Sequence, residues 1–263
     1  MKISVFQLDS FSSRVFSGNP AAVCPLEEWI DDDLQQRIAT ENAVSETAFL
    51  VPEGNGYRLR WFTPEVEVDL CGHATLAAAW VVLNELDQNK KQVTFETRGG
   101  RLTVRTGWGG KLVMDFPARE AVPRNASRAL VEGLGHEPVE VLASERDYLA
   151  IFDSEDSIER MRPDMARLRA LDRLGIIVSA PGDTADFVSR FFAPSVGVPE
   201  DPATGSAHCT LAPYWAGRLA KGDTIMEARQ LSKRGGRLLC RHLGTRVAIA
   251  GDVTPYLRGE ISV

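Results

Sequence analysis

The feature of this sequence that most constrains its fold is an internal repeat. The chain contains CGHATLA at residues 71–77 and a related run, TGSAHCTLA, at residues 204–212. Upstream of these runs lie RWFTP at 60–64 and RFFAP at 190–194. Arg60 and Arg190 are 130 positions apart, close to half of the 263-residue chain. A repeat of this period predicts a duplicated domain.

Each half predicts the same order of elements: strands, one apolar helix and more strands. The helix over 72–86 is apolar on most faces, which favours burial inside a barrel-like or strongly curved sheet. A second such helix spans 205–219, with Pro213 as a candidate kink. The proline-containing stretch 117–124 is the best linker. We therefore expect an α/β (α+β) chain with one domain at 1–117 and another at 125–263.

Composition excludes several classes of protein. A formal net charge of −6, with no long run of Lys or Arg, argues against a nucleic-acid-binding surface. The N-terminal residues lack the continuous apolar segment of a secretory signal. The longest weakly charged run, 70–84, is too short to cross a bilayer, so we expect no membrane association. Four scattered cysteines do not form a disulfide framework, which predicts a cytoplasmic protein with reduced thiols.

Gly72 and Gly205 occupy matching positions at the predicted starts of the two central helices. A glycine there lets the backbone approach a ligand closely, and the N–H groups of the first helical turn bind anions. A single such glycine is explained by a tight turn. Two in matched contexts favour sites for a carboxylate or for an enolate-like transition state.

Glu46 lies in a run of small and apolar residues at the start of a predicted strand, 44–51. Burial raises the pKa of a carboxyl group and makes it an effective acid–base catalyst near neutral pH. The alternative is a water-facing glutamate on an edge strand. The composition of the run leaves both interpretations open.

Three further polar residues flank the two glycines. His73 follows Gly72, Ser206 follows Gly205, and Asp201 precedes the second helix. Histidine titrates near neutral pH, and a carboxylate can orient it. Gly205-Ser206 lacks the spacing of a serine-hydrolase elbow, which argues against that mechanism.

A zinc site is an alternative for the same stretches. If the halves pack about a pseudo-two-fold axis, two cysteines and two histidines converge: Cys71, His73, His208 and Cys209. Neither half has the usual ligand spacing, and neighbouring helical residues such as His208 and Cys209 point in different directions. We therefore expect no metal.

Four separated motifs, in order, resemble the PhzF-like family of phenazine biosynthesis. They are FSGNPAAV at 16–23, NAVSETAF at 42–49, DLCGHAT at 69–75 and EDPATGSAH at 200–208. The resemblance covers essentially the whole chain. It implies the diaminopimelate-epimerase-like fold, in which two similar domains, related by a pseudo-two-fold duplication, each wrap a curved sheet or barrel around a central helix. It also implies an active site in the cleft between the domains, and a homodimer.

The resemblance assigns roles to matching positions. Glu46 matches the acid–base group of a metal- and cofactor-independent isomerase, and His73, Asp201 and Ser206 match its other polar positions. Gly72 and Gly205 match the backbone anion-binding positions, and Asn19 lies in a matching motif as a substrate-binding residue. The phenazine enzyme of this family moves a proton between carbons of trans-2,3-dihydro-3-hydroxyanthranilate.

One departure bears on mechanism. Related epimerases carry a cysteine at each helix start, whereas this chain has Cys71 at one start and Thr204 at the other. The missing second thiol argues against two-cysteine epimerisation. We expect a biosynthetic isomerase that acts on a small carboxylate-bearing metabolite. The alternatives are a racemase or epimerase that uses Cys71 with another base, and a non-catalytic metabolite-binding or interaction protein.

Overall fold

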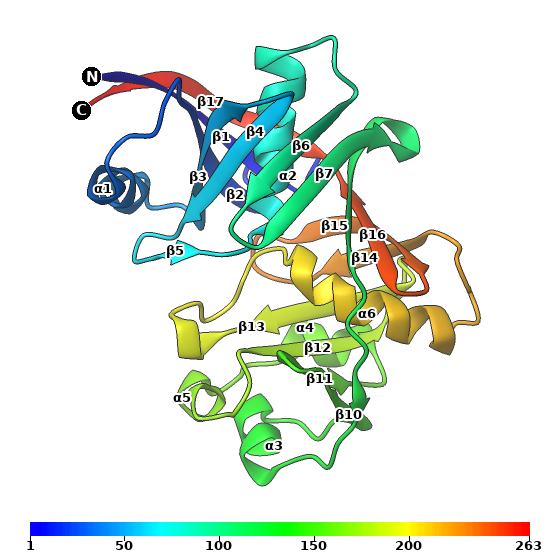
Figure 1. The fold of residues 1–263 in the computed structure, drawn as a ribbon. Helices are drawn as coiled ribbons and strands as arrows, with labels where there is room; N and C mark the ends of the chain where they lie inside the picture. The colour runs from blue at the N-terminus through cyan, green and yellow to red at the C-terminus, as the bar shows by residue number, and fades with distance from the viewer. The chain divides into compact units, whose positions relative to one another are not determined.

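The computed structural model describes residues 1–263, which divide into two compact units. Unit 1 comprises Met1–Asp115 with Ala250–Val263, and unit 2 comprises Phe116–Ile249. The last strand, β17 (Val253–Ser262), pairs antiparallel along the whole of β1 (Lys2–Ser10), which places the C-terminal segment in unit 1. The bounds predicted from the sequence place this segment in the second domain instead. The two ends of the chain lie side by side (Figure 1). Local sequence patterns do not predict a pairing between segments so far apart in the chain.

Unit 1 is a mixed sheet with one helix on each face. Its strands pair in the order β17-β1-β2-β3-β4-β6-β7-β8, with the short β5 also on β4. The remaining elements are β2 (Asn19–Pro25), α1 (Asp32–Asn42), β3 (Glu46–Glu53), β4 (Gly56–Phe62), β5 (Glu67–Val68), α2 (Gly72–Val81), η1 (Val82–Leu86), β6 (Gln92–Thr97), β7 (Gly100–Gly107), η2 (Trp108–Gly110) and β8 (Lys111–Pro117).

The two helices of unit 1 differ in how much of their surface is buried. α1 begins where the Asp31 carboxylate accepts bonds from the Asp33 and Leu34 amides, and only one face of it is covered, with Ile38 and Ala39 packed in a core beside Phe49. α2 is buried along nearly its whole length and contacts β1, β2 and β3. Its alanines are fully buried, and their small side chains let these strands approach the helix closely. The predicted buried helix is therefore confirmed.

Unit 2 repeats this plan. Its strands pair in the order β9-β10-β11-β12-β13-β14-β15. The elements are β9 (Val122–Pro123), α3 (Arg128–Leu134), β10 (Glu140–Ala143), β11 (Asp147–Ile151), α4 (Glu155–Arg160), α5 (Met165–Arg169), β12 (Gly175–Pro181), β13 (Phe187–Phe192), η3 (Pro194–Val196), α6 (Gly205–Arg218), β14 (Met226–Gln230), β15 (Gly236–Leu243) and β16 (Arg246–Gly251).

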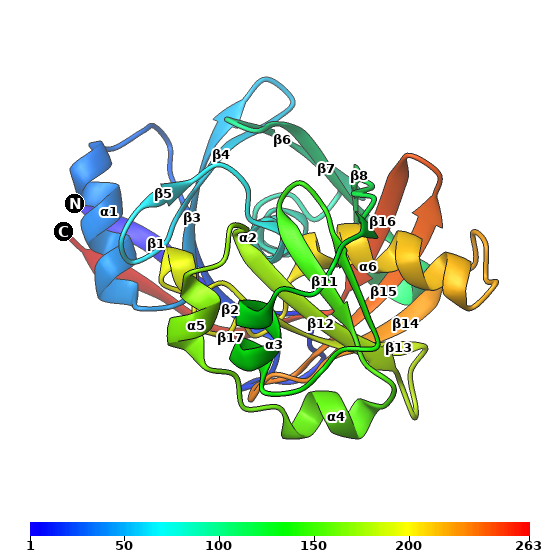
Figure 2. The ribbon, with the colours of Figure 1, turned by 90° about the horizontal axis from the view of Figure 1, so that it is seen from below.

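The helices of unit 2 cover the two faces of its sheet. On one face, Ile158 of α4 and Leu168 of α5 join a core with Ile176 of β12, as the view in Figure 2 shows for α4 beneath β12 and β13. On the other face, Trp215 of α6 donates its indole N–H to Ser179 at 2.9 Å and stacks on Phe187. α4 and α5 are two short helices and not one longer helix, because Pro163 lies between them.

An arginine buttress, the pair Arg60–Glu67 in unit 1 and Arg190–Glu200 in unit 2, confirms the repeat in three dimensions. Arg60 donates to Glu67 through two nitrogens at 2.8 and 3.0 Å, and its guanidinium lies over Phe62. Arg190 makes the matching contacts with Glu200 at 2.7 and 3.0 Å and lies over Phe192. The repeated RxF pattern therefore supports the loop before each central helix in the same way.

The central helices end differently. α2 passes into a π-helical turn at 82–86, where the Asp87 amide donates to the Val82 carbonyl at 2.7 Å. α6 continues through Pro213, and the Cys209 carbonyl, which proline leaves without its helical donor, accepts instead from the Arg119 amide at 2.9 Å. Neither helix, nor any other, is both long and apolar enough to cross a membrane.

Candidate active site

Three elements of unit 1 meet at the start of α2. β3 begins with Glu46, between β2 and β4 in the sheet, so Glu46 is not an edge-strand residue. Asn19 is the first residue of β2 and is fully buried. It follows Gly18, which has φ +71° and whose Cα hydrogen faces the Ser10 carbonyl so closely that a Cβ would lie 2.2 Å from that oxygen. Only glycine therefore allows the turn that delivers Asn19.

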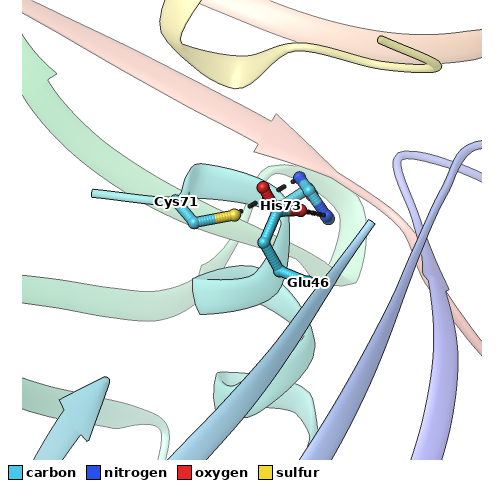
Figure 3. A group of neighbouring side chains, drawn as sticks. All are labelled: Glu46, Cys71 and His73. Atoms are coloured by element: carbon cyan, nitrogen blue, oxygen red, sulfur yellow. Dashed lines mark hydrogen bonds and ion pairs between the residues drawn. The ribbon is translucent and has the colours of Figure 1, made fainter. Parts of the chain in front are cut away.

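Glu46 and His73 form an ion pair in this position. The Glu46 Oε2 atom lies 2.9 Å from His73 Nε2 (Figure 3), and the two side chains are 18% and 6% exposed. The Ser10 hydroxyl donates to the His73 backbone carbonyl at 2.8 Å and ties β1 to the same turn. The pair is thus held on strands and a helix, with Glu46 the more accessible partner.

The second ring nitrogen of His73 faces two other side chains. Asn19 Nδ2 lies 3.1 Å from His73 Nδ1, and Cys71 Sγ lies 3.5 Å from it. A neutral ring with its proton on Nε2 accepts at Nδ1 from the Asn19 amide. An imidazolium needs an acceptor at Nδ1, which the Asn19 carbonyl supplies when the amide is turned over. Asn19 can therefore serve both protonation states.

The charges of this group are coupled. Burial lowers the pKa of His73, but electrostatic interactions and hydrogen bonds with the Cys71 and Glu46 side chains outweigh burial and raise it well above 6.5. Burial raises the pKa of Cys71 to about 11, helped by the Glu46 charge, so Cys71 is a thiol at neutral pH. The interactions that favour an imidazolium thus come from both neighbours, Cys71 and Glu46.

The two central helices also differ from the others at their N-termini. Side chains cap α1, α3, α4 and α5, through Asp31, Ser127, Ser154 and Asp164. Cys71 and Thr204, the N-cap residues of α2 and α6, make no side-chain cap bond, and neither first turn contains an acid. Both central helices thus keep first-turn amides without a side-chain partner, as an anion-binding helix start requires.

In unit 2, the remaining predicted residues gather at the start of α6. Gly205 is buried, and Ser206 and Asp201 are half-buried. The Thr204 hydroxyl donates to Asp201 Oδ2, and Gln230 accepts from the Thr204 amide at 2.7 Å and donates to the Asp201 carbonyl at 2.8 Å. Thr204, the counterpart of Cys71, therefore helps to orient Asp201.

The strand registers show what unit 2 carries in place of Glu46. Thr47 pairs with Phe62, and Ile176 pairs with Phe192, so the residue before each pair is a counterpart: Glu46 in unit 1 and Gly175 in unit 2. A Cβ on Gly175 would lie 2.3 Å from the Asp147 carboxylate and 2.5 Å from the Phe191 ring. No acid fits at that position, so the Glu46 function is not duplicated.

The four residues considered for zinc separate into two sets. Cys71 and His73 lie together with Glu46. In unit 2, His208 Nδ1 contacts the Thr204 carbonyl of its own helix at 2.8 Å, and burial lowers its pKa to about 4. Burial raises the pKa of Cys209 to about 11. Both are explained by packing within unit 2.

Two residues that contact the helix starts, Ser10 and Gln230, are not predicted from the sequence. Each reaches a helix start from a strand distant in the chain, and an isolated Ser or Gln in a strand carries no local signal of such a contact. Cys71 is a candidate from the sequence, but its contact with Nδ1 of His73 follows only from the first turn of α2.

Comparison with known proteins agrees with this architecture. Residues 8–259 match the family model described as phenazine biosynthesis-like protein. The chain belongs to this family. It is 51% identical over 261 residues, 99% of each chain, to an uncharacterized isomerase of Pseudomonas aeruginosa. The crystal structure of a PhzF family protein of Enterococcus faecalis covers the whole of both chains with a TM-score of 0.96 and 40% identity.

A more distant structure shows the fold alone. A hydroxyproline epimerase of Agrobacterium vitis is 10% identical and has a TM-score of 0.64, with 99% of this chain and 91% of that chain covered. The predicted duplicated, epimerase-like α/β fold is therefore confirmed. Membership of the PhzF-like family supports an isomerase or epimerase activity for this chain.

Proposed function

We propose that this protein is an isomerase that moves a proton on a small carboxylate-bearing metabolite, with Glu46 as the acid–base group and without a metal or cofactor. The observation that carries the proposal is the Glu46 carboxylate, 2.9 Å from His73 at the uncapped start of α2. Glu46 is the partly exposed member of an otherwise buried polar group. A carboxylate in such a position exchanges protons with a bound ligand.

The proposed reaction has two proton transfers. Glu46 takes a proton from a substrate carbon, and the electrons of the broken C–H bond enter the adjacent conjugated system. Glu46 then returns the proton to a different carbon, so no atom or electron is gained or lost. His73 orients the carboxylate, and Asn19 and the Ser10 contact hold the imidazole and its backbone in place.

The helix starts supply the substrate anchor in this proposal. The first-turn amides of α2, at Gly72 and His73, bind a carboxylate and stabilise the charge that develops when the proton leaves. Those of α6, at Gly205 and Ser206, have the same uncapped geometry. Asp201, oriented by Thr204, is a further titratable group that the family resemblance assigns to the reaction. The homodimer implied by the resemblance stays a prediction.

The racemase alternative rests on Cys71, whose sulfur contacts His73 Nδ1. Its pKa of about 11 keeps the thiol protonated, so Cys71 is a poor base at neutral pH. Full activity in Cys71→Ala would count against a thiol mechanism.

The decisive experiment is proton NMR of a panel of small cyclic and amino-acid carboxylates incubated with the protein in D₂O. We expect deuterium incorporation at carbon, lost by about 10⁴-fold in Glu46→Gln, since one acid–base group contributes up to about that factor. Glu85→Gln is the matched control, because Glu85 is similarly shielded, at 16% exposed, but pairs with Arg258.

The other outcomes are equally informative. Unchanged exchange in Glu46→Gln would overturn the assignment of the acid–base group. Compounds that bind without any exchange would favour the non-catalytic metabolite-binding alternative. A double-mutant cycle with Asp201→Asn tests that residue, because groups that act in one step give non-additive losses.

A further inference from the structure

Three different metal-binding side chains converge at the start of α2, a carboxylate, a thiol and an imidazole (Figure 3). We propose that Glu46, Cys71 and His73 bind a zinc-type divalent cation, and that the bound ion inhibits the enzyme by occupying its acid–base group. The inhibition rests on the proposed function, whereas the binding rests on geometry alone. The ion would be a regulator or poison of the site, not a participant in the reaction.

The Cys71–His73 pair already has the spacing of two zinc ligands. Zinc binds thiolate sulfur at about 2.3 Å and imidazole nitrogen at about 2.0–2.1 Å with tetrahedral angles, which separates the two donor atoms by about 3.5 Å. The observed distance from Cys71 Sγ to His73 Nδ1 is 3.5 Å. The two residues are the N-cap and the second residue of α2, so the helix itself sets this spacing.

Glu46 supplies the third ligand. The donor atoms of all three residues lie within 4.8 Å of one another. The Glu46 carboxylate now faces the other ring nitrogen, Nε2, and a shift of its side chain brings it to an ion at Nδ1. Glu46 is also the most exposed of the three, so we place the open fourth position on the Glu46 side of the ion. Three protein ligands and one open position form the usual arrangement of a non-structural zinc site.

Asn19 opposes the ion but does not exclude it. Its Nδ2 lies 3.1 Å from His73 Nδ1 and must turn away, at the cost of about one hydrogen bond. A thiolate, an imidazole and a carboxylate on one ion recover far more than that. Hard ions such as Mg²⁺ prefer oxygen ligands, so this donor set selects zinc and cadmium.

The test measures metal binding without substrate. Zn²⁺ is titrated into the intact protein in competition with a chromophoric chelator, and Cd²⁺ is added separately to record thiolate-to-metal charge-transfer absorption in the ultraviolet. We expect one Zn²⁺ per chain and a Cd²⁺–thiolate band, both lost in Cys71→Ala. Cys209→Ala is the matched control, because Cys209 is also buried on a central helix with a raised pKa.

Loss of any ligand should weaken zinc binding by more than about 100-fold, since even outer-shell partners contribute 10–100-fold. His73→Gln provides a second variant in case Cys71→Ala fails to fold. No zinc binding by the wild-type chain, or equal loss in Cys209→Ala, would overturn the proposal. Binding is scored apart from turnover, so zinc binding without any isomerase activity would leave this site standing while the proposed function falls. Exchange activity insensitive to bound zinc would overturn the inhibition.

Discussion

The starts of α2 and α6 are built on one frame and differ in chemistry. Each helix begins with a glycine, lacks a side-chain cap and follows a loop tied down by an arginine buttress. At α2 the frame carries the Glu46–His73 pair. At α6, Gly175 and Ser206 stand in the corresponding positions, and Asp201 is introduced from the preceding loop. Both copies thus keep a helix start without a side-chain cap, while only unit 1 carries the carboxylate–imidazole pair.

The largest difference in stability between matched variants of the two units should come from the arginine buttress. Arg190 is 10% exposed and also donates to the Ile158 and Met161 carbonyls, whereas Arg60 is 18% exposed and pairs additionally with Asp32 at the surface. We expect Arg190→Ala to lower the free energy of unfolding by about 3–5 kcal/mol, because it leaves Glu200 and two carbonyls without their donor.

Arg60→Ala should lower it by about 1–3 kcal/mol, because Glu67 keeps its ion pair with Arg98 and the other partner, Asp32, lies at the surface. Urea unfolding followed by circular dichroism measures both variants. Arg190→Lys is the control that keeps the charge but loses the paired hydrogen bonds. Equal losses in the two units would contradict the difference in burial.

The pH dependence of stability should distinguish the two helix histidines. The pKa of His208 in the folded protein is about 4, below its ordinary value of 6.5. Between these two pH values, His208 is therefore protonated in the unfolded chain but neutral in the folded protein. The free energy of unfolding therefore falls by about 3 kcal/mol as the pH drops from 6.5 to about 4. His73 acts in the opposite direction: its contribution is complete below 6.5 and is lost as the pH rises through its raised pKa.

Urea unfolding at a series of pH values tests this contrast. His208→Gln should flatten the decline between pH 6.5 and 4. His73→Gln should leave the slope of that decline unchanged, but lower the free energy of unfolding at every pH below the raised His73 pKa. An acid limb that persists unchanged in His208→Gln would show that other groups cause it.

The smallest expected effect concerns Asn19. Asn19→Ala should slow turnover by about tenfold, the equivalent of one hydrogen bond to the imidazole, with kcat affected more than KM. The imidazole proton resonances of His73 should also shift, which a purely structural role would not produce. Asn84→Ala, at an exposed asparagine whose amide bonds the Trp80 carbonyl, should change neither. An unaltered His73 spectrum would refute a positioning role for Asn19.

Much of the fold could be predicted because its signals are local or periodic. The repeated Gly-Ala-rich helices and the RxF runs each follow from a few adjacent residues. The same is true of Glu46 and His73 as candidates, since both fall in recognisable motifs. The pairing of the C-terminal strand β17 with β1 in unit 1 could not be predicted, because the two strands lie at opposite ends of the chain.

The sequence by itself determined the duplication, the two buried helices and the residue types at their starts, because covalent order and side-chain periodicity encode them directly. The tertiary structure decided which of those residues touch. It alone brings Glu46 against His73 Nε2 and sets Cys71 and Asn19 on Nδ1. It also places the Phe191 ring so close to Gly175, the counterpart of Glu46, that no side chain fits there. The reason is physical: contacts between strands depend on register and packing, which no single segment of the chain specifies.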